Sequence, residues 1–139
     1  MTRQWIVLIC AAVSMCDAAA IDIPMQRKLA MEALDSKTCY GTIKTRGQLL
    51  GYELGGRLLV SASGRLVELE ATGAFEIGKR APRRYTGHGI TVTIVPQRAM
   101  RHDDTEEALS IVLEEGRALV SERGRGQGFQ VKVSEICTP

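Results

Sequence analysis

The feature that most constrains the fold of this chain is the regular return of glycine-containing pairs between short apolar segments after Cys39. Gly55-Gly56 and Ser63-Gly64 each separate two such segments, and a two-residue spacer of this kind is a strong signal for a β-hairpin. Residues 90–95 (ITVTIV) alternate between two faces, as a half-buried strand does. The sequence therefore predicts a mainly β, antiparallel domain.

Prolines set the other expected boundaries. Because proline cannot donate to a strand ladder, Pro82 predicts an irregular stretch over residues 78–84, and Pro96 predicts a strand end before a polar loop over 97–107. About eight strands with tight turns favour a small antiparallel β-barrel or sandwich, and the pattern leaves both open. The expected strands are residues 39–44, 48–54, 57–62, 65–71, 74–77, 90–95, 108–114, 117–122 and 129–137.

Two further glycine-containing segments predict turns in the second half of the chain. Glu115-Gly116 is expected to join the strands at 108–114 and 117–122, and residues 124–128 are expected to form a flexible turn. In the strand at 65–71, Leu66 is an apolar exception on the otherwise polar face.

The start of the chain has the layout of a secretory signal peptide. A short basic start precedes the apolar run WIVLICAAVSM, and Ala18 and Ala20 supply the small residues that a signal peptidase accepts. The run is shorter than the about 20 residues that a membrane-spanning helix needs, so we expect no transmembrane segment in the mature chain. We predict a periplasmic or secreted protein cleaved near Ala20. The alternative is a lipoprotein anchored at Cys16.

The predicted organisation is a signal peptide at residues 1–20, an N-terminal helical arm at 21–37 and a β domain at 38–139. Within the arm, apolar residues recur at helical spacing after Pro24, which predicts one short helix over residues 25–35. The helix is expected either to pack on the rim of the β domain or to remain a frayed arm, with partner binding as a further possibility.

Removal of the signal leaves two cysteines, Cys39 and Cys137. An even pair in an exported chain most simply forms one disulfide, which here would join the first and last strands. Two buried thiols are the alternative.

A basic cluster is the strongest candidate binding site. The formal net charge is only +2, which argues against a nucleic-acid binder, but Lys79, Arg80, Arg83 and Arg84 lie within six residues and Tyr85 follows them. Such a patch suits a protein or an anionic polymer of the cell envelope, and a solvated loop is the alternative.

A second hypothesis comes from a local resemblance. The segment Ser61-Ala62-Ser63-Gly64, followed by Gly78-Lys79-Arg80-Ala81, is similar to the Ser-Ala-Ser-Gly and Lys-Gly elements of periplasmic inhibitors of C-type lysozyme. Those are small exported β-barrels in which a serine and a lysine enter the lysozyme cleft. The resemblance implies that Ser63 and Lys79 would be the inserting pair.

No motif predicts an enzyme. No nucleophile elbow is present, the glycines near Arg125 lack the context for dinucleotide binding, and His88 and His102 have no metal-ligand spacing. We therefore expect no catalytic residue, no cofactor and no metal. The favoured hypothesis is a non-enzymatic binding protein of the bacterial envelope. The alternatives are the lysozyme inhibitor and a structural accessory of an envelope complex.

Overall fold

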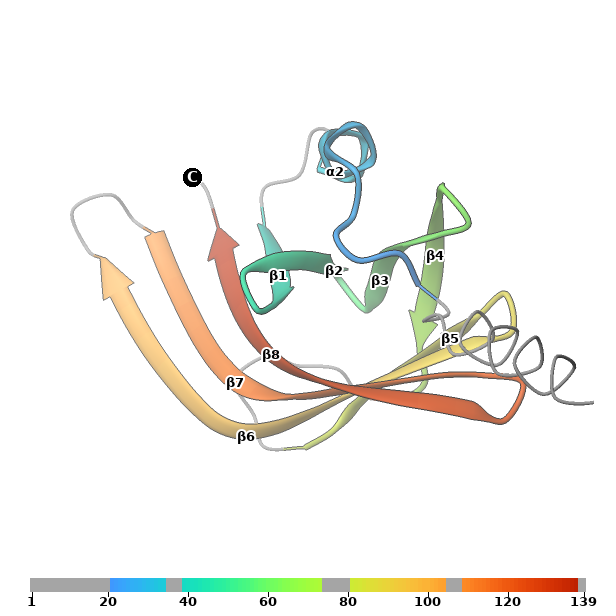
Figure 1. Cartoon of the computed structure of the whole chain (residues 1–139). Coiled ribbons are helices and arrows are strands. Elements are labelled where there is room, and N and C mark those ends of the chain that lie inside the picture. The colour runs from blue at the N-terminus through green and yellow to red at the C-terminus, as the bar shows by residue number, and fades with distance from the viewer. Residues whose placement is uncertain (1–20, 35–38, 74–80, 105–108, 138–139) are drawn as a thin grey trace, which may run out of the picture.

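The chain forms a closed antiparallel barrel in which β1 to β8 follow one another in order and β8 pairs back with β1 (Figure 1). The computed structural model describes residues 21–34, 39–73, 81–104 and 109–137. Of the two folds that the sequence left open, barrel and sandwich, the chain therefore forms the barrel. The strand expected at 74–77 lies outside the described residues. The strands are β1 (Cys39–Thr45), β2 (Gln48–Leu54), β3 (Arg57–Ala62), β4 (Arg65–Ala71), β5 (Arg83–Gly87), β6 (Ile90–Asp104), β7 (Leu109–Glu122) and β8 (Arg125–Cys137).

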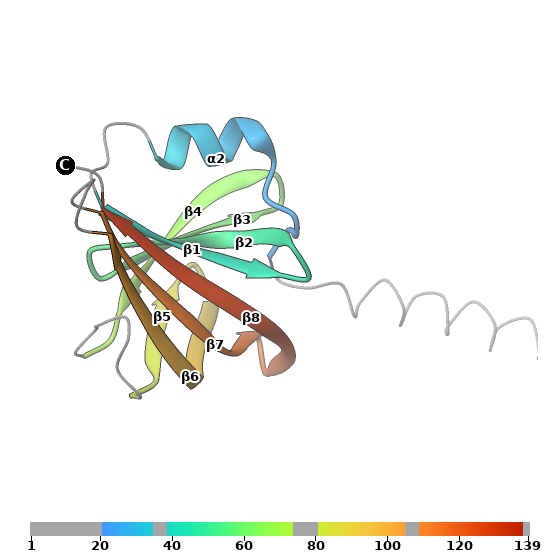
Figure 2. The ribbon, with the colours of Figure 1, turned by 90° about the vertical axis from the view of Figure 1, so that its left-hand side faces the viewer.

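One short helix, α2 (Arg27–Ala33), precedes the barrel in the described residues and lies within the range that the sequence predicted. Figure 2 shows α2 lying across the outer face of β2, β3 and β4. Leu29 and Ala33 are its buried residues, whereas Met31 is 68% exposed. The helix is thus packed against the barrel. None of the helices described is long and apolar enough to span a bilayer.

Two apolar clusters lie on opposite faces of the first four strands. The larger fills the barrel and includes Leu58, Val60 and Leu69. The smaller lies between α2 and the barrel wall, where Leu29 packs in one cluster with Leu66 of β4. The apolar Leu66 on the otherwise polar outer face of β4 is therefore explained, because it packs against the helix.

A bulge in β2 lets this strand serve both clusters. Ile43 pairs with Gly51 but its neighbour Lys44 pairs with Leu49, so Leu50 is an extra residue without a partner in β1. A bulge reverses the inside-outside alternation along the bulged strand. Leu50 consequently faces the interior cluster, while Tyr52 beyond the bulge belongs to the cluster under the helix.

The second half of the barrel differs most from the sequence-based expectation. Pro96 does not end its strand, because β6 continues to Asp104 after a register shift between Pro96 and Arg98. Residues 97–104 are therefore strand and not loop. Glu115-Gly116 is not a turn either, since β7 is continuous through it and pairs with β6 along its whole length.

Gly116 explains why this pairing is possible. It faces Pro96 across the ladder, and a Cβ built on Gly116 would lie 2.2 Å from the carbonyl oxygen of Val95. The two backbones approach too closely for any side chain. Gly116, which the sequence analysis assigned to a turn, is therefore needed because no side chain fits at the bulge next to Pro96.

Two-residue turns join most of the neighbouring strands. In the turn after β5, His88 and Gly89 have φ values of 53° and 76°, and Ser63 and Gly64 after β3 have 52° and 76°. Positive φ at both central residues is the geometry of a type I′ hairpin turn. The turn before β8 has the same form, so β8 begins at Arg125 and residues 125–128 are strand, not the expected flexible turn.

The segment before α2 is hydrogen-bonded to the barrel near the β3–β4 turn. Ile21 is 2% exposed and belongs to the interior cluster. The Asp22 carboxylate accepts hydrogen bonds from the Ser61 hydroxyl at 2.9 Å and from the Gly64 backbone N–H at 2.8 Å. Residues 21–25 therefore form part of the folded domain.

Candidate functional site

The basic cluster predicted from the sequence does not form one exposed patch. Arg83 and Tyr85 are 1% and 0% exposed, and both lie inside the barrel, whereas Arg84 between them is exposed. The irregular stretch expected up to Arg84 ends earlier, because β5 begins at Arg83 and its residues alternate between inside and outside. Lys79 and Arg80 lie outside the described residues.

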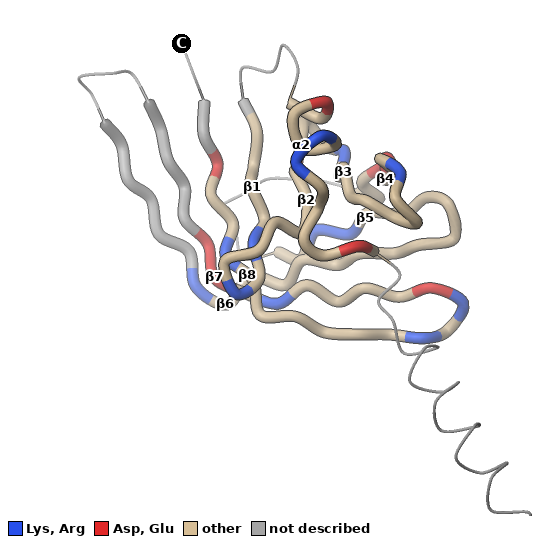
Figure 3. Tube along the Cα trace, turned by 45° about the horizontal axis from the view of Figure 1, so that its top comes forward, with Lys and Arg blue, Asp and Glu red and all other residues tan. Residues whose placement is uncertain are grey.

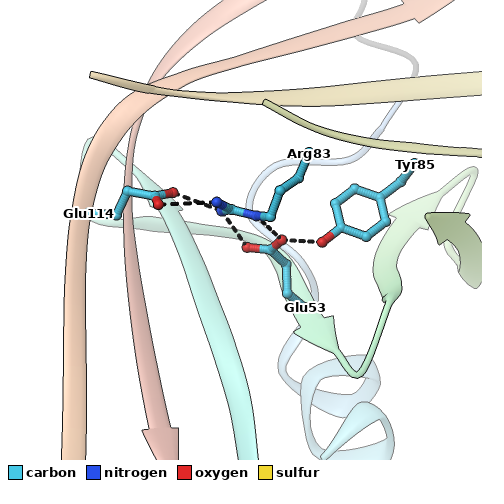
Figure 4. A network of polar contacts seen from close by, with 4 residues as sticks. All are labelled: Glu53, Arg83, Tyr85 and Glu114. Carbon is cyan, nitrogen blue, oxygen red and sulfur yellow. Dashed lines mark hydrogen bonds and ion pairs between the residues drawn. The ribbon is translucent and has the colours of Figure 1, made fainter. Parts of the chain in front are cut away.

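Inside the barrel, Arg83 bridges two carboxylates (Figure 4). Its Nε and Nη2 donate to Glu53 of β2 at 2.7 and 2.9 Å. Its Nη1 and Nη2 donate to Glu114 of β7 at 3.0 and 2.7 Å. The Tyr85 hydroxyl also donates to Glu53. We call these four residues the interior network.

The electrostatics of the interior network favour charged Arg83 and neutral Tyr85. Burial alone would lower the pKa of the Arg83 guanidinium, but the hydrogen bonds and charges of Glu53 and Glu114 outweigh it and raise the pKa. Burial raises the pKa of the Tyr85 phenol, and the charge and hydrogen bond of Glu53 raise it further. Tyr85 therefore stays a hydrogen-bond donor.

The interior network ties together strands that are not neighbours in the sheet. β5 pairs with β4 at only two positions, Glu70 with Thr86 and Ala71 with Tyr85. Arg83 joins β5 to β2 and β7 across the interior, so its ion pairs reinforce the barrel beside this short seam. No buried polar side-chain atom in the described residues lacks a hydrogen-bond partner. The network accordingly has a structural role.

Ser63 and His88 are both exposed at the tips of hairpin turns. The Asp22 carboxylate lies beside the turn that holds Ser63, where it accepts hydrogen bonds from Ser61 and from the backbone N–H of Gly64. No three histidine, cysteine, aspartate or glutamate side chains of the described chain come together in an arrangement that would hold a metal ion.

A row of charged residues that the sequence analysis missed crosses the outer face of the barrel. Strand register places Arg98, Glu115, Lys132 and Lys44 side by side on β6, β7, β8 and β1. All four are exposed. In Figure 3 the blue segments of neighbouring strands lie around the red segment of β7. The row carries three positive charges and one negative charge.

Lys44 and Lys132 are direct partners across the β1–β8 ladder. Like charges directly opposite each other destabilise a sheet. Within the described part of the chain, neither lysine forms an ion pair, so only the neighbouring Glu115 offsets their repulsion. No local sequence signal points to this pair, because the two lysines meet only when the last strand closes on the first.

The row borders a groove of about 760 Å³, which we call the lysine groove. Among the described residues, its lining combines cations with neutral hydrogen-bonding groups and contains a single carboxylate. The residues that line it are Thr42, Lys44, Arg46, Gly47, Gln97, Glu115, Gln130, Val131, Lys132 and Ser134. A groove of this composition is suited to an anionic ligand that also carries hydrogen-bonding groups.

Comparisons of the chain with protein-family models, with curated proteins and with solved structures find no match. The candidate site is therefore defined by its own geometry.

Proposed function

We propose that this protein is a non-enzymatic binding protein of the bacterial envelope that holds an anionic partner in the lysine groove. The observation that carries the proposal is the register of Lys44 opposite Lys132 on an exposed face. Like charges on directly opposite residues repel each other, and an anion placed between the two lysines would relieve that repulsion while forming charge-assisted hydrogen bonds.

The signal-peptide layout of residues 1–20 supports export to the periplasm or beyond, and cleavage near Ala20 is part of the proposal. The burial of Ile21 supports a folded domain that starts at this residue. A lipoprotein anchored at Cys16 is the alternative.

A disulfide between Cys39 and Cys137 is also part of the proposal. The two cysteines are Cα partners at the end of the β1–β8 ladder. Directly opposite residues in antiparallel strands have Cα atoms about 4.5–5.5 Å apart, which lies within the range for disulfides.

Binding of anionic probes tests the function directly. Titration with dextran sulfate, inorganic polyphosphate and polygalacturonate presents sulfate, phosphate and carboxylate groups. We expect saturable binding of at least one probe, and a loss of affinity of at least about tenfold in the Lys44→Gln/Lys132→Gln variant, since each lost charge-assisted contact is worth more than 1 kcal/mol. Added salt should weaken the binding.

The control for the effect of net charge is Arg27→Gln/Lys28→Gln on α2. It also removes two positive charges, but from exposed positions away from the lysine groove. This variant should bind nearly as well as the unmodified protein. An equal loss in both variants would show non-specific attraction, and no binding of any probe would refute the function.

The lysozyme-inhibitor hypothesis keeps one supporting observation. Ser63 is exposed at the tip of the β3–β4 turn, where a partner can reach it. Inhibition of a C-type lysozyme that is lost in Ser63→Tyr would favour this second candidate over the anion-binding function.

A further inference from the structure

The lysine groove adjoins a second groove, whose lining includes residues of the interior cluster as well as exposed residues. The second groove measures about 700 Å³, and Arg46 and Gln130 line both grooves. It extends past Arg117 toward the β7–β8 hairpin and the segment around Asp22. The two grooves together form a track that is longer than a single anionic group requires.

Arg117 lines this track beside Gly128 of β8. A Cβ built on Gly128 of β8 would lie 2.5 Å from Nη2 of Arg117. The guanidinium therefore lies against the bare backbone of Gly128, where a larger residue would displace it. From register, Arg117 and Lys44 are two strands and two residues apart, which is roughly 12 Å.

The neutral lining of the track favours a hydroxyl-rich ligand. Side-chain amides and hydroxyls donate and accept hydrogen bonds, as sugar hydroxyls do. Protein interfaces depend on large buried anchors, mainly Trp, Tyr and Arg, and of these the described lining holds Arg46 and Arg117 but neither Trp nor Tyr. Phe129, which is half-buried and packed against the interior cluster, is the aromatic residue in the described lining. The neutral polar residues are Thr42, Thr45, Gln48, Gln97, Gln127, Gln130 and Ser134.

We propose that the ligand is an extended acidic polysaccharide that lies along both grooves, with one acidic group between Lys44 and Lys132 and another at Arg117. This inference rests on the proposed function and specifies its ligand. Arg46 at the junction contacts the middle of the chain, and the amides and hydroxyls bind the sugar hydroxyls between the charged groups.

Oligogalacturonates of increasing length test the track. Affinity should rise with length until the chain spans both grooves and should then level off, because each added contact contributes only while it falls within the site. Arg117→Gln should reduce the affinity for long oligomers about tenfold and leave that for the shortest unchanged. Arg65→Gln removes one charge from an exposed residue outside both grooves and should change neither.

Gly128→Ala provides a second variant, which tests the position of Arg117 while leaving its charge unchanged. The added methyl meets only the end of a flexible side chain, so the thermal unfolding midpoint should hold, while the affinity for long oligomers falls by less than in Arg117→Gln because the guanidinium is displaced but its charge remains. Unchanged affinity in both variants would overturn the role of Arg117.

Poly(L-glutamate) with a matched number of carboxylates separates a sugar chain from an acidic polypeptide. Tighter binding of polygalacturonate supports the inference, and tighter binding of poly(L-glutamate) overturns it in favour of a protein partner. Length-independent binding that still depends on Lys44 and Lys132 would overturn the extended track alone. Absence of binding to every anionic probe would refute the proposed function itself.

Discussion

Arg83 is the residue on which the charge balance of the barrel interior depends. Its replacement by Met would leave Glu53 and Glu114 buried without the guanidinium between them. Breaking a buried ion pair from one side costs about 3–5 kcal/mol, and we expect a loss of that size in the free energy of unfolding measured with urea at pH 7. The exposed neighbour provides the control, since Arg84→Met should cost less than about 0.5 kcal/mol.

Neutralising the two carboxylates tests the cause of this loss. Glu53→Gln/Glu114→Gln added to Arg83→Met should recover much of the stability, because no buried charge then remains unbalanced in the interior network. Equal stabilities for Arg83→Met and Arg84→Met would contradict the structural role of the network.

Tyr85 makes the stability of the barrel depend on alkaline pH. The pKa of its phenol is raised in the folded state, so above the unfolded-state pKa of about 10 the unfolded chain releases a proton that the folded chain keeps. Stability is therefore fully present below about pH 10 and falls as the pH rises beyond it, by up to about 1.4 kcal/mol per pH unit for this group.

Urea unfolding of Tyr85→Phe between pH 9 and 11 measures this contribution. The variant should be less stable at pH 7 by about 1–2 kcal/mol, through the lost hydrogen bond to Glu53, and should lose stability less steeply above pH 10. Burial also raises the pKa of Tyr52, so some slope remains. A slope as steep as that of the unmodified protein would contradict the assignment.

At the scale of strands, the β6–β7 ladder depends on one residue without a side chain. Gly116→Ala would place a methyl 2.2 Å from the Val95 carbonyl oxygen, where only backbone could move. We expect a loss of about 1–3 kcal/mol or more in the free energy of unfolding, as for other over-packed positions. Gly126→Ala on β8 is the matched control, since its nearest contact would be 3.9 Å and its φ is not positive. A similar small effect of both substitutions would contradict this explanation.

The same strands show how far local pattern predicts this fold. Residues 48–54, 57–62 and 65–71 match β2, β3 and β4, because each is short and ends at a glycine-containing turn. The sequence predicts a strand end at Pro96 and a turn at Gly116, whereas β6 and β7 continue through these residues. Proline and glycine have the same local signature whether they form a turn or face each other in a bulge. Only the partner strand distinguishes these cases, and the sequence of one strand does not contain it.

At the scale of the whole molecule, closure of the barrel brings together residues that lie far apart in the sequence. Neither the interior network nor the Lys44–Lys132 pair has a local motif. The alternation from Arg83 to Tyr85 was a usable signal that these two residues share one face, but their partners on β2 and β7 were not predictable without the strand order. For the same reason, the sequence did not show that Arg83 and Tyr85, two members of the predicted basic cluster, belong to the interior.

The pairing of β1 with β8 also predicts a disulfide that links the first and last strands of the barrel. If Cys39 and Cys137 are bonded, the disulfide closes a loop of nearly the complete folded domain, and its removal should lower the free energy of unfolding by up to about 4–5 kcal/mol. The intact mass of the exported protein, with and without reduction and alkylation, should show a chain that begins at Ile21 and lacks two hydrogens. A lipid-sized addition at Cys16 would instead indicate the membrane-anchored form.

Single and double serine variants make the stability measurement specific. Cys39→Ser, Cys137→Ser and the double variant should be destabilised about equally, because loss of either sulfur breaks the same bond. Reduction should then destabilise the unmodified protein and leave the double variant unchanged. Alkylation of both cysteines without a reductant would contradict the disulfide, and the closure of the barrel would then depend on the β1–β8 hydrogen bonds and the shared core alone.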